Sequence, residues 1–224
     1  MGILFDLAPR PSLAESFVAE EQLALSASPQ LRLWTHGRAL VAGSRDGRLP
    51  DFERARSAYC QQGWEMHLRT SGGGLVVLDE GVLNVSLAWR QEALPSLEAG
   101  YATMRQVLSV ALGRLGVDAV ASGEVAGSLC PGRSDLSIDN RKLAGISQRR
   151  RRQFLLVHAF VLVSGRADDR ITTGRSFYQL AGGRPELVVS GTMCTVSEAT
   201  GQPVPVESLA AQVAEAAQGA VLGL

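Results

Sequence analysis

The sequence predicts an α+β fold of mixed, mostly antiparallel sheets with helices packed on the outside. Short apolar runs of strand length, joined by turns rich in Gly and Asp, indicate strands that pair with their neighbours along the chain. Longer segments with apolar residues at helical spacing indicate helices between the strands. No internal repeat and no change of composition divides the 224 residues, so we expect residues 1–224 to form one domain.

Capping residues mark the helix boundaries. Ser12 with Glu15 matches the capping-box pattern of a helix start, and Gly63 and Gly116 suit helix ends because glycine adopts the left-handed conformation at little cost. The predicted helices cover residues 12–25, 50–62, 94–115 and 206–221.

Strands are predicted where short apolar or alternating runs lie between turn residues. Asp79-Glu80-Gly81 is typical of a hairpin turn, so we expect the strands on either side of it to pair. Residues 122–134, which are rich in Gly and Ser, predict a loop or lid. The predicted strands cover residues 31–34, 39–42, 64–69, 75–78, 82–89, 135–138, 142–146 and 154–164.

Charge and cysteine content exclude several classes of protein. Lys plus Arg and Asp plus Glu both number 22, so the chain lacks the basic excess of a nucleic-acid-binding protein. The apolar runs are too short to span a bilayer, and residues 1–30 lack the pattern of a secretion signal. The three cysteines are widely spaced, which indicates neither a disulfide framework nor a metal site. We therefore expect a cytoplasmic protein that binds no nucleic acid, no membrane and no metal.

The basic residues are distributed unequally, because 21 of the 22 are arginine and Lys142 is the one lysine. An ammonium can release its proton, whereas a guanidinium stays protonated in proteins. Lys142 is therefore a candidate for acid–base chemistry. The alternative is a surface lysine with no role in chemistry.

A glycine-rich segment, Arg69-Thr70-Ser71-Gly72-Gly73-Gly74, connects two predicted strands. Three consecutive glycines let the backbone approach a ligand closely and present its amides to a carboxylate, phosphate or thioester oxygen. No Gly-Lys-Ser/Thr follows, so this is not a Walker loop, and the strand that comes next argues against a dinucleotide-binding loop. A flexible hairpin without a ligand is the alternative.

Cys130 lies in the predicted loop, twelve positions before Lys142. Near an ammonium a loop cysteine can persist as a thiolate, the nucleophile that attacks thioesters and other activated acyl groups. An unreactive thiol is the alternative. Cys60 and Cys194 are predicted to be packing residues.

Other titratable residues have simpler interpretations. His67 and His158 lie in apolar predicted strands and are expected to be core or edge histidines rather than catalytic bases. Asp46, Asp79 and Asp135 each adjoin a predicted turn, where aspartate is common because its side chain caps backbone N–H groups.

Together these segments resemble the lipoate/octanoate branch of the biotin/lipoate protein ligase and transferase family. The resemblance runs from about Leu13 to the last predicted helix, and its motifs follow the family's order. Those motifs are Arg69-Thr70-Ser71-Gly72-Gly73-Gly74, Asp79-Glu80-Gly81-Val82-Leu83-Asn84-Val85-Ser86-Leu87, Asp135-Leu136-Ser137-Ile138 and Arg141-Lys142-Leu143-Ala144-Gly145-Ile146. Ser128-Leu129-Cys130-Pro131-Gly132 is similar to the members that move an octanoyl chain from the glycine cleavage H protein to lipoyl domains.

The resemblance implies a fold, partners and residue roles. The fold would be the catalytic domain of lipoate-protein ligases and transferases. The partners would be lipoyl-domain proteins and the glycine cleavage H protein, the substrate an octanoyl or lipoyl group, and no cofactor would be needed. Cys130 would carry the acyl group as a thioester, and Lys142 would contact the acyl carbonyl. With that chemistry the ammonium of Lys142 would hold the thiol as a thiolate, and after losing its proton Lys142 would serve as base for the acceptor lysine. The implied substrate-binding residues are Arg69, Ser71, Gly72, Gly73, Gly74, Asp79, Asn84, Ala144 and Gly145.

An octanoyl chain requires an apolar tunnel. We expect Leu75, Val77, Leu83 and Val85 to form its walls, since they lie in strands next to the matched motifs. Each buried CH₂ of the chain would contribute about 0.8 kcal/mol to binding.

Three alternatives remain open: an ATP-dependent lipoate–protein ligase, a transferase that takes octanoate from acyl carrier protein, and a non-catalytic module that binds an acylated carrier. Many ligases carry a histidine shortly after the glycines, where this chain has Val76-Val77-Leu78-Asp79. ATP-using ligases also commonly have a further C-terminal domain, for which the residues after Gly191 are few. Both departures favour the transferase.

Overall fold

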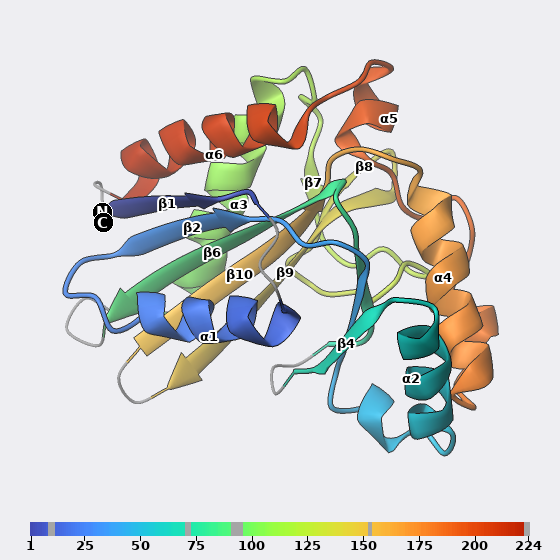
Figure 1. Ribbon diagram of the computed structural model, residues 1–224. Helices are drawn as coiled ribbons and strands as arrows, with labels where there is room; N and C mark the ends of the chain where they lie inside the picture. Colours follow the sequence, from blue (N-terminus) through green and yellow to red (C-terminus); the bar gives the residue numbers. More distant parts are fainter. Residues whose placement is uncertain (9–11, 70–72, 91–95, 152–153, 222–224) are drawn as a thin grey trace.

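Two β-sheets and the helices around them make up the computed structural model, which describes residues 1–8, 12–69, 73–90, 96–151 and 154–221 (Figure 1). The larger sheet has seven strands in the order β1-β2-β6-β10-β9-β8-β7, and the smaller has three in the order β4-β3-β5. Most strand pairs are antiparallel; β1 with β2 and β3 with β4 are parallel. The predicted α+β class with mixed sheets is therefore confirmed.

The bounds of β2, β3, β5, β6 and β10 follow the sequence patterns closely, whereas β9 continues to Arg151, five residues beyond its predicted end. The larger sheet contains β1 (Gly2–Asp6), β2 (Gln30–Trp34), β6 (Val82–Arg90), β7 (Ala121–Ser122), β8 (Leu136–Ile138), β9 (Arg141–Arg151) and β10 (Phe154–Leu162). The smaller sheet contains β3 (Ala39–Ala42), β4 (Glu65–Leu68) and β5 (Val76–Leu78). Of these, β1 and β7 were not predicted. The five residues of β1 lie at a sheet edge, none of them fully buried, and the two exposed residues of β7 are too few, so both carry little hydrophobic signal.

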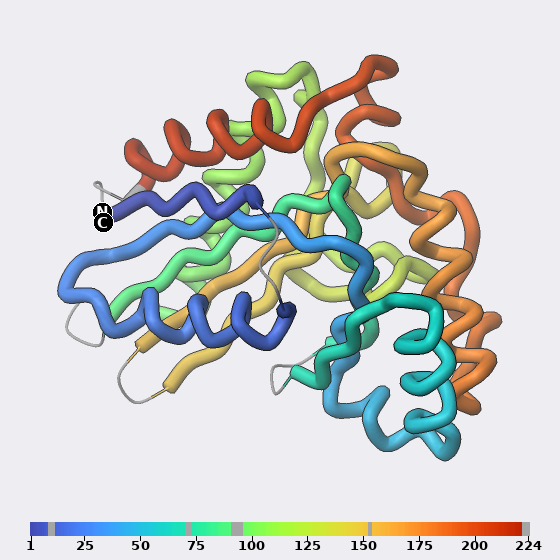
Figure 2. Tube along the Cα trace, in the orientation of Figure 1, coloured from blue at the N-terminus to red at the C-terminus, as the bar shows by residue number. Residues whose placement is uncertain are grey.

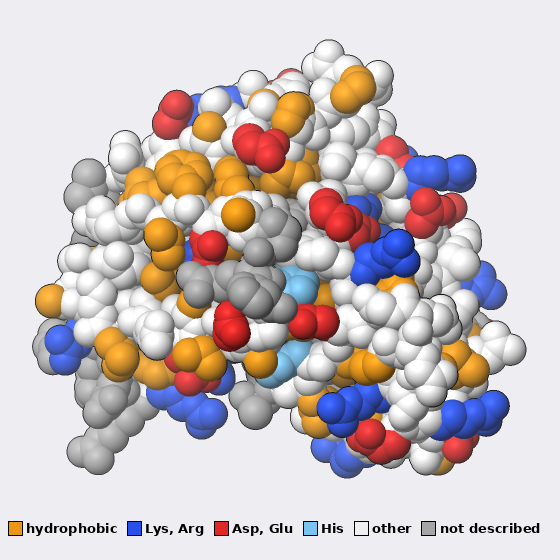
Figure 3. Space-filling model, viewed as in Figure 1, with side chains coloured by type: hydrophobic (Ala, Val, Ile, Leu, Met, Phe, Trp, Pro, Cys, Tyr) orange, Lys and Arg blue, Asp and Glu red, His pale blue; other side chains and the backbone are white. Residues whose placement is uncertain are grey.

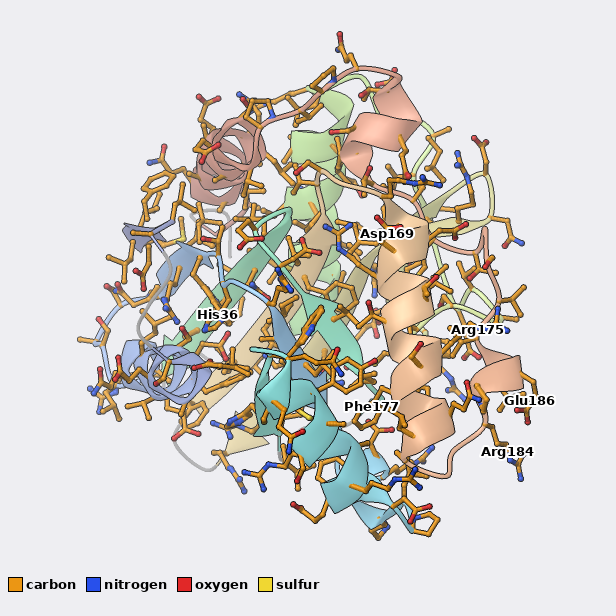
Figure 4. The ribbon with its side chains drawn as sticks, turned by 45° about the vertical axis from the view of Figure 1, so that its right-hand side comes forward. His36, Asp169, Arg175, Phe177, Arg184 and Glu186 are labelled. Atoms are coloured by element: carbon orange, nitrogen blue, oxygen red, sulfur yellow. The ribbon has the colours of Figure 1, made fainter. Side chains whose placement is uncertain are left out.

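Helices cover both sheets. They are α1 (Leu13–Leu23), α2 (Phe52–Gln61), α3 (Leu97–Gly113), α4 (Ala167–Leu180), α5 (Val196–Thr200) and α6 (Val206–Val221). Helices α3 and α6 pack together on one face of the larger sheet, and α1 lies on the opposite face (Figure 1). Helices α2 and α4 cover the smaller sheet, where Phe177 of α4 points towards α2 and Arg175 points away from it (Figure 4).

The turn at residues 79–81 does not form the predicted hairpin. The strand before it, β5, pairs with β3 in the smaller sheet, whereas β6 after it pairs with β2 and β10 in the larger one. Figure 2 traces the chain as it passes from one sheet to the other. The prediction was wrong because turn chemistry indicates a reversal but does not say which strand becomes the neighbour.

Side chains alternate across the larger sheet and divide its two faces. Leu31, Leu33, Leu83 and Val85 belong to the core under α3 and α6. The residues that alternate with these along the strands point to the other face, towards α1. There Trp34 donates a hydrogen bond to Ser86, and Ser86 donates one to Glu20 of α1. The α1 face therefore contains buried polar side chains among its apolar ones, and it borders the smaller sheet.

Candidate active site

A cavity of about 510 Å³ lies between the α1 face of the larger sheet and the smaller sheet. Its walls come from α1, β3, β5, β6, β9, β10 and the loop that contains Cys130. The residues that line it are Phe17, Glu20, Trp34, Val41, Arg69, Gly73, Val76, Leu78, Asn84, Glu98, Tyr101, Cys130, Pro131, Gly132, Arg133, Ser134, Asp135, Gly145, Ile146, Ser147, Gln148, His158, Ala159 and Phe160. The cavity thus brings together five of the eleven predicted site residues, namely Cys130, Arg69, Gly73, Asn84 and Gly145.

Lys142 anchors the loop at residues 129–135, which contains Cys130 and is called the cysteine loop below. It is fully buried at the start of β9, and its Nζ donates to the main-chain oxygens of Leu129 at 3.0 Å and Cys130 at 2.6 Å. The same Nζ lies 2.8 Å from Oδ2 of Asp135. Its three N–H groups therefore all have acceptors. The ammonium also lies 5.1 Å from the ring centroid of Phe160, which lines the cavity.

Asp135 ties the same loop to the sheet. Its carboxylate accepts hydrogen bonds from the main-chain N–H groups of Gly132 at 2.8 Å and Ile146 at 3.3 Å. Burial raises the pKa of Asp135, and the charge of Lys142 opposes that rise. Capping, the predicted role of Asp135, is confirmed, but the buried ion pair with Lys142 was not foreseen. Sequence spacing does not reveal it, because Asp135 precedes β8 and Lys142 lies in β9, and the pairing of these strands brings the two side chains together.

The Cys130 sulfur has two hydrogen-bond donors. The main-chain N–H of Gly74 donates to Sγ at 3.1 Å, and Nη2 of Arg69 donates to it at 3.3 Å. Nη2 also donates to the main-chain oxygen of Gly74 at 2.8 Å. The resemblance predicted that Lys142 would hold the thiolate, but the lysine contacts the main-chain oxygen of Cys130, and the cation that contacts the sulfur is Arg69.

Backbone conformation explains the glycine at position 73. Gly73 has a φ of 102°, and a Cβ there would lie 2.5 Å from Nη2 of Arg69 and 2.8 Å from the Cys130 sulfur. A side chain would therefore separate the two groups. Cys130 itself adopts a φ of 50°, which L residues seldom adopt.

Asp46 and Tyr178 support the glycine loop from the other side. The Tyr178 hydroxyl donates to Oδ1 of Asp46 at 3.1 Å and accepts from the N–H of Leu75 at 3.2 Å. Asp46 also caps the N–H of Gly43 at 2.7 Å, as predicted. Burial raises the pKa of Asp46, and burial together with the nearby Asp46 charge raises that of Tyr178. Tyr178 was missed because α4, which carries it, was not predicted.

The residues predicted to form the tunnel walls lie one position away from residues that line the cavity. Leu75, Val77, Leu83 and Val85 lie in the two hydrophobic cores and do not line the cavity. Their neighbours line it instead, namely Val76, Leu78 and Asn84. Successive side chains of a strand point to opposite faces, so a pattern of consecutive apolar residues does not show which parity faces the ligand.

Glu20 and His158 form a polar part of the cavity wall. Glu20 is 2% exposed; its Oε1 accepts from the Ser86 hydroxyl at 2.5 Å, and its Oε2 lies 3.7 Å from Nδ1 of His158. Burial opposes ionisation of Glu20, but His158, Ser86 and Arg32 together lower its pKa. At the surface of the face seen in Figure 3, histidine and acidic side chains gather near the middle, whereas Glu20 itself is almost fully buried.

The remaining predicted site residues lie in different environments. Asn84 and Gly145 line the cavity. Asp79 does not line it and pairs with Arg170 at 2.5 Å, and Ala144 is buried in the core under α3 and α6. Thr70, Ser71 and Gly72 fall outside the described residues.

The other two cysteines differ from each other. Cys194 is buried, as predicted, and burial raises its pKa to about 11. Cys60 is exposed, so its predicted packing role is wrong. It lies on the outer side of α2, which the polar sequence around it did not distinguish from the inner side.

Two searches over the described ranges gave no candidate. Across residues 1–8, 12–69, 73–90, 96–151 and 154–221, no group of three His, Cys, Asp or Glu side chains is arranged to hold a metal ion. Within the same ranges no helix combines the length and apolar character needed to cross a membrane.

Comparisons with known proteins agree with one another. Residues 12–218 match the family model described as the lipoyl protein ligase A/B catalytic domain. The chain is 37% identical to octanoyl-[GcvH]:protein N-octanoyltransferase of Anoxybacillus flavithermus, over 95% of this chain and 80% of that protein. It is also 37% identical to the enzyme of that name from Geobacillus kaustophilus, over 80% of this chain and 65% of that protein.

A solved structure supports the fold. The crystal structure of a lipoate-protein ligase A bound with ATP has a TM-score of 0.71 and 20% sequence identity to this chain, and the match covers 99% of this chain and 86% of that one. At that identity the likeness concerns the fold alone. With a family model that matches most of its length, and relatives above one third identity, the chain belongs to the lipoyl protein ligase A/B catalytic domain family.

Proposed function

We propose that this chain is an acyltransferase of lipoyl-cofactor assembly. It moves an octanoyl or lipoyl group, through a thioester on Cys130, to a lysine of a lipoyl-domain protein. The observation that carries the proposal is the position of the Cys130 sulfur in the wall of a largely apolar cavity, with a guanidinium and a main-chain N–H donating to it. The names of the two relatives support octanoyl as the acyl group and the glycine cleavage H protein (GcvH) as the donor.

The acyl chain binds in the cavity through apolar contacts. Val41, Val76, Leu78 and Phe160 provide that surface, and each CH₂ removed from water contributes about 0.8 kcal/mol. Gly145 is needed beside Phe160, since a Cβ there would lie 2.4 Å from Cε1 of the ring. The cavity is therefore kept open by a glycine next to Lys142 on the same strand.

Transfer takes place in two half-reactions. The Cys130 thiolate attacks the carbonyl carbon of the donor amide, the S–C bond forms, the C–N bond breaks, and the donor lysine leaves as an amine after taking a proton. The acceptor lysine then attacks the thioester, the N–C bond forms, and the S–C bond breaks. The attacking nitrogen gives up a proton and the sulfur returns to a thiolate. One proton is taken up and one is released. One lysine amide bond is broken and one is formed, so the acyl group needs no activation by ATP.

Lys142 is assigned a positioning role. Its ammonium binds the main-chain oxygens of Leu129 and Cys130 and the carboxylate of Asp135, and so holds Cys130 in its left-handed conformation. Three acceptors converge on one nitrogen, an arrangement that suits a compact ammonium and not a planar guanidinium. Proton transfer by Lys142, the other role that the resemblance implies, requires one of these hydrogen bonds to break.

The test is transfer in vitro without ATP. Octanoylated GcvH serves as donor, an unmodified lipoyl domain serves as acceptor, and the intact mass of the acceptor is measured. We expect the acceptor to gain an octanoyl group, and Cys130→Ser to abolish the gain. Cys60→Ser is the matched control, since Cys60 is exposed and does not line the cavity, and it should retain activity.

Other outcomes identify the alternatives. Transfer that needs free octanoate with ATP and Mg²⁺, and that survives Cys130→Ser, would show a ligase. Transfer from octanoyl acyl carrier protein but not from octanoylated GcvH would change the donor. Binding of octanoate without transfer from any donor would show a non-catalytic module.

A further inference from the structure

We propose that Arg69 is a catalytic residue whose guanidinium holds the Cys130 sulfur as a thiolate. This inference rests on the proposed thioester chemistry and names the group that makes the nucleophile available. It assigns to Arg69 the role that the resemblance gave to Lys142.

Two donors from one loop converge on the sulfur. Nη2 of Arg69 lies 3.3 Å from Sγ and the Gly74 N–H lies 3.1 Å from it. Nη2 also binds the Gly74 oxygen at 2.8 Å, which fixes the direction of the guanidinium. Hydrogen bonds from a cation to an anionic acceptor are stronger than those to a neutral one, so both contacts favour the thiolate over the thiol.

The charge of Arg69 needs an anion. The residue is 8% exposed, and its Nε is buried without a hydrogen-bond partner. Among the described residues no carboxylate lies within ion-pair distance of it, although the charge of Asp46 is near enough to interact with it. Burying a charge is costly unless an opposite charge lies close. A thiolate at Sγ supplies that negative charge within hydrogen-bond distance.

The other charged groups around the site already have partners or lie elsewhere in the wall. The ammonium of Lys142 is paired with Asp135 and donates to main-chain oxygens. Asp46, whose charge Arg69 favours, accepts from Tyr178 and Gly43.

Five further titratable groups line the cavity. Arg133 is exposed at the cavity wall, Glu20 faces His158, and Glu98 and Tyr101 come from α3. None of these five has a hydrogen bond to the sulfur among the described contacts. Arg69 therefore remains as the cation that directly contacts it.

Gly73 is the feature that permits this contact. A Cβ at position 73 would meet both Nη2 of Arg69 and the sulfur at less than 3 Å. The glycine is required for the thiolate–guanidinium pair as well as for the turn, where its φ is 102°. Gly73→Ala should therefore weaken the pair without removing either charged group.

The same pair acts twice in the reaction. In the first half-reaction Arg69 keeps the sulfur ionised until its electron pair forms the S–C bond. In the second, the S–C bond breaks and the electron pair returns to sulfur, so the guanidinium stabilises the leaving thiolate. The proton lost by the thiol passes to solvent at the open side of the cavity, and no co-reactant is needed.

The experiment measures the rate of alkylation of Cys130 by iodoacetamide against pH. The background is Cys60→Ser, so that Cys130 is the accessible thiol among the three cysteines, and the modified residue is identified by mass. Arg69→Gln should move the midpoint of the profile upward by about one pH unit or more, which slows alkylation at neutral pH about tenfold. Arg69→Lys keeps the positive charge but loses the planar guanidinium, so its midpoint should lie between the midpoints of Arg69→Gln and of the background protein.

Arg133→Gln is the matched control. It removes one positive charge from the wall of the same cavity, and its midpoint should stay within a few tenths of a pH unit of the background protein. A folded Arg69→Gln protein, judged by circular dichroism, with an unchanged midpoint would overturn the inference. If Arg69→Gln does not fold, Gly73→Ala and Arg69→Lys decide, because an unchanged midpoint in both overturns it equally.

Alkylation requires no acyl donor, so the two proposals fail separately. A shifted midpoint in a protein that transfers no octanoyl group would contradict the proposed function and leave the Arg69 pairing intact. Normal octanoyl transfer by the background protein, with no shift of the alkylation midpoint in Arg69→Gln, would contradict the Arg69 pairing and leave the proposed function intact.

Discussion

A lysine at position 142 is the only basic side chain of the sequence whose charge sits on a single nitrogen. A single charged nitrogen fits this position, because three oxygen atoms from Leu129, Cys130 and Asp135 surround Nζ. Sequence composition was enough to single out the residue, but its partners were not predictable. They depend on how the loop at residues 129–135 returns to the start of β9.

The first prediction concerns this buried ion pair. Lys142→Met leaves the Asp135 carboxylate buried without its partner and should lower the free energy of unfolding by about 3 kcal/mol or more. Asp135→Leu should cost a similar amount for the converse reason. The double variant should cost clearly less than the sum, because no buried charge is left alone. Urea unfolding of the four proteins measures these energies, and additive losses would contradict the pairing.

A second prediction concerns two glycines with opposite surroundings. Gly145→Ala places a methyl group 2.4 Å from the Phe160 ring, so the ring must move into the cavity and octanoyl transfer should fall at least tenfold. Gly219→Ala is the control, because a Cβ there meets nothing within 4 Å, and it should stabilise α6 by up to about 1 kcal/mol. Transfer rates and thermal unfolding are measured for both, and equal effects would refute the argument.

At the scale of elements, the sequence predicted the central strands and four of the six described helices; it missed α5, which has five residues, and α4. That helix carries Gly174 in its middle, a residue that weakens a helical pattern. The structure shows the reason for the glycine, since a Cβ there would lie 2.4 Å from Leu129 of the cysteine loop. The close approach of α4 to this loop is a tertiary contact, and no local pattern encodes it.

The third prediction concerns which side chains of β5 face the cavity and which face the core. Val76→Phe extends a ring into the cavity and should shift acyl preference from octanoyl towards shorter chains at little cost in stability. Val77→Phe overpacks the core of the smaller sheet and should cost about 1–3 kcal/mol without changing chain preference. Transfer with hexanoyl, octanoyl and decanoyl donors, together with urea unfolding, separates the two effects. The reverse assignment of effects would show that the strand faces the other way.

At the scale of the whole molecule, the site exists because the chain crosses between two sheets. Arg69 and Gly74 follow or precede strands of the smaller sheet, whereas Lys142 and Phe160 belong to the larger one. The sequence indicated the α+β class and the order of the motifs. It did not indicate the crossing at residues 79–81, so the relative position of the two halves of the site was beyond local patterns.

Stability against alkali gives the fourth prediction. The thiol of Cys194 has its pKa raised from 9.0 to about 11 by burial. Between these values the unfolded thiol has lost its proton and the folded one has kept it. The neutral buried thiol therefore stabilises the folded protein fully below pH 9. As the pH rises from 9 to about 11 this stabilisation is lost, and the free energy of unfolding falls by about 3 kcal/mol. Cys194→Ala should lack this loss, and a difference from wild type that stays constant from pH 8 to pH 11 would contradict it.

The central claim is that Cys130 itself carries the acyl group, and a single-turnover experiment tests it most directly. The protein is mixed with octanoylated GcvH without any acceptor, and its intact mass and cysteine peptides are measured before and after neutral hydroxylamine. The account predicts one octanoyl group on Cys130, removed by hydroxylamine and absent from Cys130→Ser. Transfer to an acceptor by the Cys130→Ser protein, or an octanoyl group found only at another residue, would contradict it.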